Sequence, residues 1–146
     1  MTSNATAAPA FPIASLIKRF LSVAYEVLLL AAVLFTGALP FLLLAGDSDS
    51  AVLRPLFQCY LLLLAGSYFV WQWTRGGQTL PMKTWRLKLV TREGAPLTLR
   101  HGLRRFLFAL AGLALAGIGF AWALVDPDRQ FLHDRLAGTR IVMSDE

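Results

Sequence analysis

Residues Phe20–Ala45 read FLSVAYEVLLLAAVLFTGALPFLLLA, a run of 26 residues in which Glu26 is the one formal charge. A helix needs about 20 mostly apolar residues to cross the hydrocarbon of a bilayer, so this stretch predicts a membrane-spanning helix. An acidic residue at the centre of such a helix costs about 2.5–3.5 kcal/mol on insertion scales. Glu26 is therefore a candidate functional residue, for which we expect a neutralising partner or a bound proton.

The composition of the whole chain is typical of a membrane protein. Hydrophobic residues make up 56% of the 146 residues and charged residues only 16%, with a mean hydropathy of +0.56. The net charge of +5 comes from basic residues between apolar stretches, so we expect no nucleic-acid partner. One cysteine, Cys59, and two histidines predict no disulfide, no metal site and no cofactor. The sequence has no nucleophile with a positioned base, so we do not expect an enzyme.

Three segments are long and apolar enough to span a membrane, at about 16–45, 52–73 and 106–125. We therefore predict an all-α membrane protein with three transmembrane helices. The predicted organisation is a flexible N-terminus (1–15), one transmembrane domain (16–143) and a short tail (144–146).

Loop charges predict the orientation of these spans. The N-terminal segment and the 74–105 loop together carry ten Lys and Arg residues, against four on the other side. By the positive-inside rule, the N-terminus and this loop are cytoplasmic. Asp47 and Asp49 then belong to a short outer loop, and the tail with Asp134 lies across the membrane from Arg19.

The 74–105 loop combines a strand-like stretch with clustered positive charge. From Trp85 to Leu89, apolar and basic residues alternate, as in a strand with one apolar and one charged face. Basic side chains near a membrane surface attract anionic headgroups by about 1 kcal/mol each. The candidate lipid-binding residues are Arg86, Lys88, Arg92, Arg100, Arg104 and Arg105. The alternative is that these charges only fix the topology.

The third apolar segment is rich in small residues spaced four apart, such as Gly112 and Ala116. This spacing favours close helix packing, either in a homo-oligomer or, as we favour, within one subunit. A second topology is a re-entrant hairpin broken at Gly117 and Gly119, which would return the tail to the cytoplasm and let residues 140–143 pair with 85–90. We prefer three crossings because a break that faces lipid would leave backbone groups unpaired. In both topologies we expect residues 131–136 to be interfacial, with His133 at headgroup level.

Three motifs in this order resemble the RDD family of bacterial membrane proteins. They are Arg19 with an acidic residue seven positions on, Gly77-Gln-Thr-Leu-Pro-Met-Lys83, and Leu132-His-Asp-Arg-Leu-Ala-Gly-Thr139. The family is named for one arginine and two aspartates, to which Arg19, Glu26 and Asp134 correspond. Further matching motif residues are Gly77, Gln78, Thr79, Lys83, His133, Arg135, Gly138 and Thr139.

The chain departs from the family pattern at two positions. Glu26 stands where the family has aspartate, and Pro81 where it more often has glycine. The resemblance implies a location in the bacterial cytoplasmic membrane and a transport-type activity, with Arg19, Glu26 and Asp134 as ion- or proton-handling candidates.

Glu26 carries the functional hypothesis. Seven residues separate it from Arg19, so the two share a helix face but differ by roughly 10 Å of rise, too far for an easy ion pair. Arg19 would extend toward water and headgroups. The remaining candidate partners of Glu26 are Gln58, Gln72, Tyr60 and Tyr68.

We expect Glu26 to exchange a proton for a cation in a small-ion transporter that self-associates, because three helices enclose little room for a solute path. Two alternatives stay open. One is a protonated glutamate that only bonds a neighbouring helix. The other is a non-transporting scaffold or partner subunit whose basic loop binds anionic lipid or protein.

Overall fold

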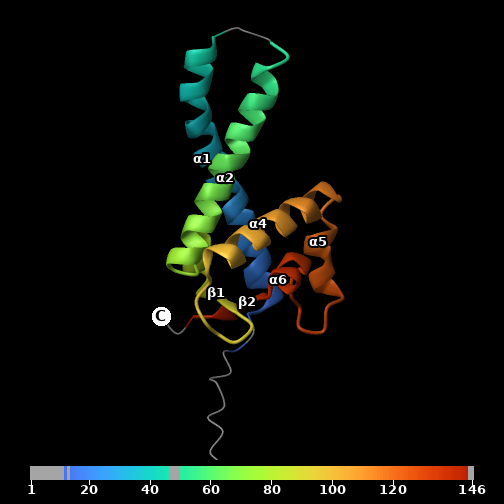
Figure 1. Ribbon diagram of the computed structural model, residues 1–146. Helices are drawn as coiled ribbons and strands as arrows, with labels where there is room; N and C mark the ends of the chain where they lie inside the picture. Colours follow the sequence, from blue (N-terminus) through green and yellow to red (C-terminus); the bar gives the residue numbers. More distant parts are fainter. Residues whose placement is uncertain (1–11, 13, 47–49, 145–146) are drawn as a thin grey trace, which may run out of the picture.

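The computed structural model describes residues 12, 14–46 and 50–144. The predicted outer-loop residues Asp47 and Asp49, and most of the predicted N-terminus and tail, lie outside these ranges. Two long helices, α1 (Leu16–Ala45) and α2 (Leu53–Arg75), form a hairpin, and the rest of the chain folds beside the end where α1 begins (Figure 1).

The remaining elements are short, apart from one amphipathic helix. In chain order they are α3 (Leu80–Thr84), β1 (Leu87–Thr91), α4 (Leu99–Ala114), α5 (Ile118–Ala121), the 3-10 helix η1 (Trp122–Leu124), α6 (Leu132–Ala137) and β2 (Thr139–Met143). The strands β1 and β2 pair antiparallel, with Leu87 opposite Met143 and Thr91 opposite Thr139. We call α3, the sheet and α6 the base.

Among the described residues, α1 and α2 are the two continuous helices that are long and apolar enough to cross a membrane. Ser15 caps the start of α1 by accepting a hydrogen bond from the Lys18 amide. The two helices approach closely at Gly37, where a Cβ atom would lie 2.2 Å from a methyl group of Leu64. There the Tyr60 hydroxyl donates to the Gly37 carbonyl at 2.9 Å.

The predicted third span, 106–125, is not one helix. α4 begins earlier, at Leu99, and ends at Ala114, and α5 with η1 then continues at an angle of 107°. Ala116 and Gly117 make the turn with positive φ angles of 57° and 76°. Gly112 and Gly119 touch across it, since a Cβ on either would lie 3.2 Å from the Cα atom of the other. These two glycines therefore serve close packing within one subunit.

The pairing of β1 with β2 decides where the tail lies. β1 precedes the bent pair α4–α5 and β2 follows it, so the segments on either side of the bend meet in one sheet. A single crossing would separate them by the thickness of the membrane. The prediction that the tail lies across the membrane from Arg19 is therefore wrong. The chain is mostly helical, but this sheet makes the all-α description incomplete.

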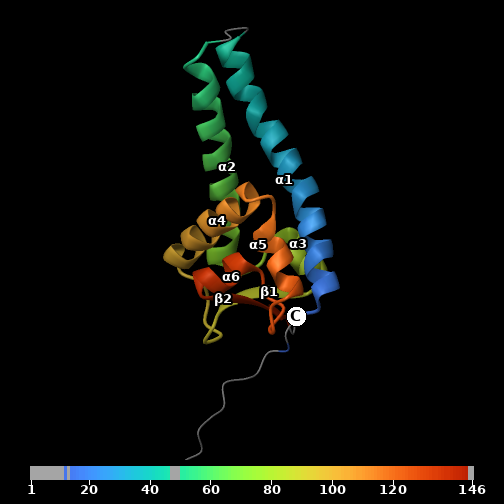
Figure 2. The ribbon, with the colours of Figure 1, turned by 90° about the vertical axis from the view of Figure 1, so that its right-hand side faces the viewer.

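The core of the molecule lies at the base of the α1–α2 hairpin, where β1 and β2 run beneath α4 and α6 (Figure 2). Leu87 and Leu89 on β1 are fully buried while Lys88 between them is exposed, and Val90 and Thr91 after them are both buried. Other core side chains are Ala14, Trp73, Met82, Leu97, Ala123, Phe131 and Ile141.

Hydrogen bonds join the segment between α2 and α3 to the main chain of β1. The Leu89 amide donates to the Gly77 carbonyl at 2.7 Å, and the Gln78 side-chain amide donates to the Leu87 carbonyl at 2.8 Å. Gly77 has a φ of 67°, and a Cβ there would lie 2.6 Å from the Leu89 carbonyl oxygen. A glycine is required at this position by conformation and by space.

Replacing Gly77 with alanine should destabilise the protein by about 1–3 kcal/mol, because the new Cβ adds strain and a clash with β1. The measurement is the unfolding temperature in detergent, followed by tryptophan fluorescence. Gly76→Ala is the matched control, because Gly76 has a φ of −135° and open space around it. Equal unfolding temperatures for the two variants would contradict this account of Gly77.

Candidate functional site

Arg19 joins the first helix to the end of the chain. Its side chain is 1% exposed, and its Nη2 atom donates to the Ile141 carbonyl on β2 at 3.1 Å. The Nη1 atom donates to the carbonyl of Arg129. The guanidinium is thus enclosed by the C-terminal part of the chain, and the prediction that it extends toward headgroups is wrong.

Asp126 shapes the loop that offers the Arg129 carbonyl to Arg19. Its Oδ2 atom accepts from the Gln130 amide at 3.0 Å, and its Oδ1 atom lies 2.6 Å from Nε of Arg135. Burial would raise the pKa of the Asp126 carboxyl, but the Gln130 amide and the Arg135 guanidinium hold that pKa below its usual value. Asp126 therefore stays charged at neutral pH and fixes the loop geometry.

Asp134 and Arg105 form a buried ion pair between α6 and α4. The Oδ1 atom of Asp134 accepts from Nε of Arg105 at 2.8 Å and lies 2.7 Å from Nη2. The Arg105 guanidinium also lies over the Trp73 ring, 4.3 Å from its centroid. Because Arg105 is only 6% exposed, its prediction as a lipid-binding residue is wrong.

The other predicted lipid-binding residues lie on the surface. Arg86, Lys88, Arg92, Arg100 and Arg104 are all exposed. Arg104 and Arg105 are neighbours with opposite surroundings, because successive residues of a helix point about 100° apart. These five residues remain candidates for contact with headgroups.

His133 lies inside the protein, not at headgroup level as predicted. Its ring stacks on Phe131 with centroids 5.3 Å apart, and its Nε2 atom lies 3.7 Å from the Asp134 carboxylate. Burial lowers the pKa of His133, the Asp134 charge opposes this shift, and the Arg105 charge adds to it, so that the pKa is about 4. His133 is therefore neutral at pH 7 and fills space beside the ion pair.

Glu26 is held by two hydroxyl groups from different elements. The Tyr68 hydroxyl on α2 donates to Oε1 at 2.8 Å, and the Thr79 hydroxyl, which also caps α3, donates to Oε2. Tyr68 is one of the four partners predicted from the sequence, whereas Tyr60 bonds Gly37 instead. In the described part of the chain, Glu26 forms no ion pair within 4 Å, and the Arg105 charge acts on it from a longer distance.

The three residues that correspond to the family signature therefore separate into two groups. Arg19 and Asp134 are buried together in the base and interact electrostatically. Glu26 lies on the α1–α2 side of the base, where Thr79 connects it to α3. Arg105, which is outside the signature, forms an ion pair with Asp134, and its charge also acts on Glu26 from a longer distance.

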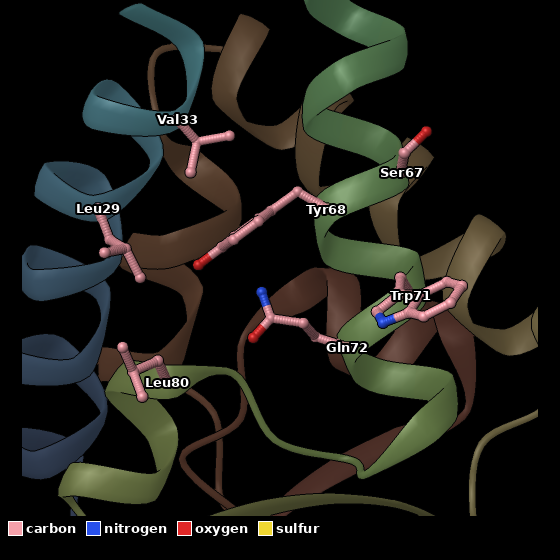
Figure 3. A pocket seen from close by; sticks show the side chains of 7 residues that line it. All are labelled: Leu29, Val33, Ser67, Tyr68, Trp71, Gln72 and Leu80. Carbon is pink, nitrogen blue, oxygen red and sulfur yellow. The ribbon is translucent and has the colours of Figure 1, made fainter. Parts of the chain in front are cut away.

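A groove of about 600 Å³ runs between α1 and α2 beside the Glu26 site. Its lining residues are Leu29, Val33, Ser67, Tyr68, Trp71, Gln72 and Leu80. Tyr68 and Gln72 point from α2 across the groove toward α1 (Figure 3). The groove is mostly apolar, and these two side chains bring polar groups into it.

Most of the remaining motif residues make contacts within the base or with Glu26. Thr79 bonds Glu26, Gly138 ends α6 with a φ of 72°, and the Thr139 hydroxyl donates to the Asp134 carbonyl at 3.4 Å. Arg135 lies between Asp126 and Asp128, and Lys83 is exposed on α3. No group of three His, Cys, Asp or Glu side chains converges for a metal ion in the described ranges.

Sequence reasoning missed Arg105, Asp126 and Trp73 as parts of the site. A signal for Arg105 exists in its helix, because it follows Gly102 by three residues and so lies near the face on which Gly102 packs against Val70 of α2. Asp126 gave no comparable signal, since its role depends on the turn after η1.

Two apolar helices with a buried charge network at one end define a small multi-pass membrane protein. The sequence model of the RDD family matches residues 13–138, which is most of the chain, and the protein belongs to the RDD family. No curated protein and no solved structure matches the chain.

The buried ion pair predicts a strong dependence of stability on Asp134. Removing one partner of a buried pair leaves the other charge uncompensated, so Asp134→Asn should cost about 3–5 kcal/mol. Asp128→Asn is the matched control, because Asp128 pairs with Arg135 at the surface and should change stability by less than about 1 kcal/mol. Chemical unfolding in detergent measures both values, and similar losses would contradict the central place of the Arg105–Asp134 pair.

The buried neutral His133 predicts acid sensitivity above pH 4. Between pH 6.5 and about 4 the unfolded chain binds a proton at this histidine that the folded chain does not, so stability falls as pH falls. The loss over this window should be about 3 kcal/mol, and His133→Phe should remove it. Unfolding temperatures from pH 7.5 to 4.5 provide the test; an unchanged pH profile in the variant would contradict it.

Proposed function

We propose that this protein exchanges small cations for protons across the bacterial cytoplasmic membrane, with Glu26 as the exchanging carboxylate and with the N-terminus in the cytoplasm. The observation that supports this most is that Glu26 is hydrogen-bonded but has no cationic partner among the described residues. Two hydroxyl groups orient it, but it forms no ion pair among the described residues, unlike Asp134. A carboxylate of this kind can accept a proton or a cation without first breaking an ion pair.

The oxygens around Glu26 suit alkali cations. Hard cations prefer carboxylate, hydroxyl and carbonyl oxygens, and the site offers the Glu26 carboxylate with the Tyr68 and Thr79 hydroxyls, while the Gln72 side chain lies in the adjoining groove. A proton and a cation would compete for the same carboxylate. When the carboxylate binds a proton on one side of the membrane, it releases its cation there. When it loses the proton on the other side, it can bind a new cation, so that one monovalent cation is exchanged for one proton.

The other two residues of the family signature, Arg19 and Asp134, have a different role in this proposal. Arg19 and Asp134 hold the base together through buried contacts, so the proposal gives them a structural role and no part in ion handling. The base in turn positions Thr79 on Glu26. Because two helices enclose little room for a solute path, the proposal includes self-association of the protein in the membrane.

Ion flux in proteoliposomes tests this proposal. With an outward proton gradient, the wild-type protein should take up sodium or potassium, and Glu26→Gln should reduce the rate at least about tenfold, since relay carboxylates carry the transported charge. Glu26→Asp should retain part of the rate, because it keeps the carboxylate with one methylene fewer.

Glu93→Gln serves as the control, because it removes one negative charge from an exposed turn outside α1 and α2. Wild-type flux in Glu26→Gln would contradict the exchange role of Glu26. A fall in flux with Glu93→Gln as large as with Glu26→Gln would assign the loss to net charge and not to the site.

A second candidate function is a non-transporting scaffold or partner subunit. The observation in its favour is that five basic residues outside the long helices are exposed, namely Arg86, Lys88, Arg92, Arg100 and Arg104. Such a surface would attract anionic lipid or an acidic protein. This function predicts no gradient-driven flux with either sodium or potassium, and binding that weakens with added salt.

A further inference from the structure

We infer that α4 and α5 form a re-entrant hairpin that enters one leaflet of the membrane, turns at Leu115–Gly117 and leaves on the side from which it entered. The partner of its apolar surface is the acyl chains of that leaflet. The inference concerns membrane insertion and does not depend on ion exchange at Glu26.

The path of the chain requires a return. β1 and β2 lie on either side of the bent pair in sequence and are joined by hydrogen bonds. In both views α4 runs obliquely away from the sheet, and the tip of the α4–α5 bend reaches a level only part-way along α2 (Figures 1 and 2). The hairpin is therefore shorter than the α1–α2 hairpin beside it.

The turn pairs part of its own backbone, which reduces the number of polar groups that a break in lipid would leave unpaired. The Leu115 amide donates to Ala111, the Gly117 amide to Gly112 at 3.1 Å, and the Ile118 amide to Leu115 at 3.3 Å. Beyond the turn, the Phe120 and Ala121 amides both donate to the Gly117 carbonyl. These hydrogen bonds within the turn lower the cost of placing the bend in hydrocarbon.

The outer surface of the hairpin is apolar on both arms. Its exposed large side chains are Leu103, Leu107, Leu113, Leu115, Ile118, Trp122, Leu124 and Val125. The opposite face of α4 packs on α2, where Gly102 contacts Val70 and the Phe69 and Phe106 rings lie 6.3 Å apart. The apolar surface of the hairpin therefore continues that of the spanning helix α2, which favours lipid over a water-facing position.

The charges near the hairpin agree with entry and exit on one side. Exposed Arg100 and Arg104 lie in the first turns of α4, and Asp126 and Asp128 follow directly after η1. Between Arg105 and Asp126 the sequence has no charged residue. Both ends of the hairpin are thus at headgroup level, while its tip lies among the acyl chains.

Cysteine labelling with a membrane-impermeant maleimide tests the return path. In a Cys59→Ser background, Glu93→Cys lies before the hairpin, Ser144→Cys after it, and Ser50→Cys in the described part of the α1–α2 loop. We expect the first two positions to react from the same side of sealed vesicles and Ser50→Cys from the opposite side. Labelling of Ser144→Cys from the side of Ser50→Cys would overturn the inference.

Spin labels in nanodiscs test what covers the hairpin. Labels at Leu113 and Ile118 should be accessible to oxygen and protected from a polar nickel reagent, like a reference label at Leu28 on α1, which is 71% exposed. A label at Glu93 provides the water-exposed reference. Access of the nickel reagent to Leu113 and Ile118 would overturn the inference, as would strong spin–spin coupling between copies, which would assign this face to a second subunit.

Discussion

The hydrogen bonds from Arg19 to the end of the chain are the constraint on which the rest of the structure depends. They connect the start of the first long helix to the last strand, across 122 positions of sequence. The guanidinium has carbonyl acceptors on β2 and on the loop shaped by Asp126, and the Asp134 and Asp126 charges act on it. Without this donor, the buried carbonyls would lose their partner and β2 would lose a buried hydrogen bond from α1.

The same charge network explains why the base can be buried at all. Isolated buried charges cost several kcal/mol each, and the network offsets this cost by pairing Arg105 with Asp134 and Arg135 with Asp126. Each of these residues comes from a different part of the chain than Arg19. The network therefore specifies one arrangement of α1, α4, α6 and β2, since a shifted arrangement would leave a charge unpaired.

The sequence predicted the parts of the structure that follow from local composition. The largely apolar run Phe20–Ala45 is a helix throughout, and Tyr68 is a partner of Glu26 as expected. The path of the third apolar segment was harder to predict, because hydrophobicity does not show whether an apolar segment crosses the membrane or turns back. Its return depends on the turn at Ala116 and Gly117 and on contacts with residues far away in sequence.

The buried polar residues were predictable as members of a motif but not as contacts. Arg104 and Arg105 look alike in sequence, yet one is exposed and the other is enclosed between Trp73 and Asp134. That difference comes from the helix face against which α2 and α6 pack. Glu26 lies beside this network. The Thr79 hydroxyl bonds its carboxylate, and the charge of Arg105 acts on it, so the proposed exchange site depends on the fold of the base.

Hydrogen–deuterium exchange of β2 tests the role of Arg19 most directly. A hydrogen bond from a charged group contributes about 1.5–3 kcal/mol, so in Arg19→Ala the amides of Thr139–Met143 should exchange at least about tenfold faster, with those of α2 unchanged. Arg75→Ala, which removes an exposed arginine stacked on Trp71, should leave β2 protected. Unchanged protection of β2 in Arg19→Ala would contradict the account.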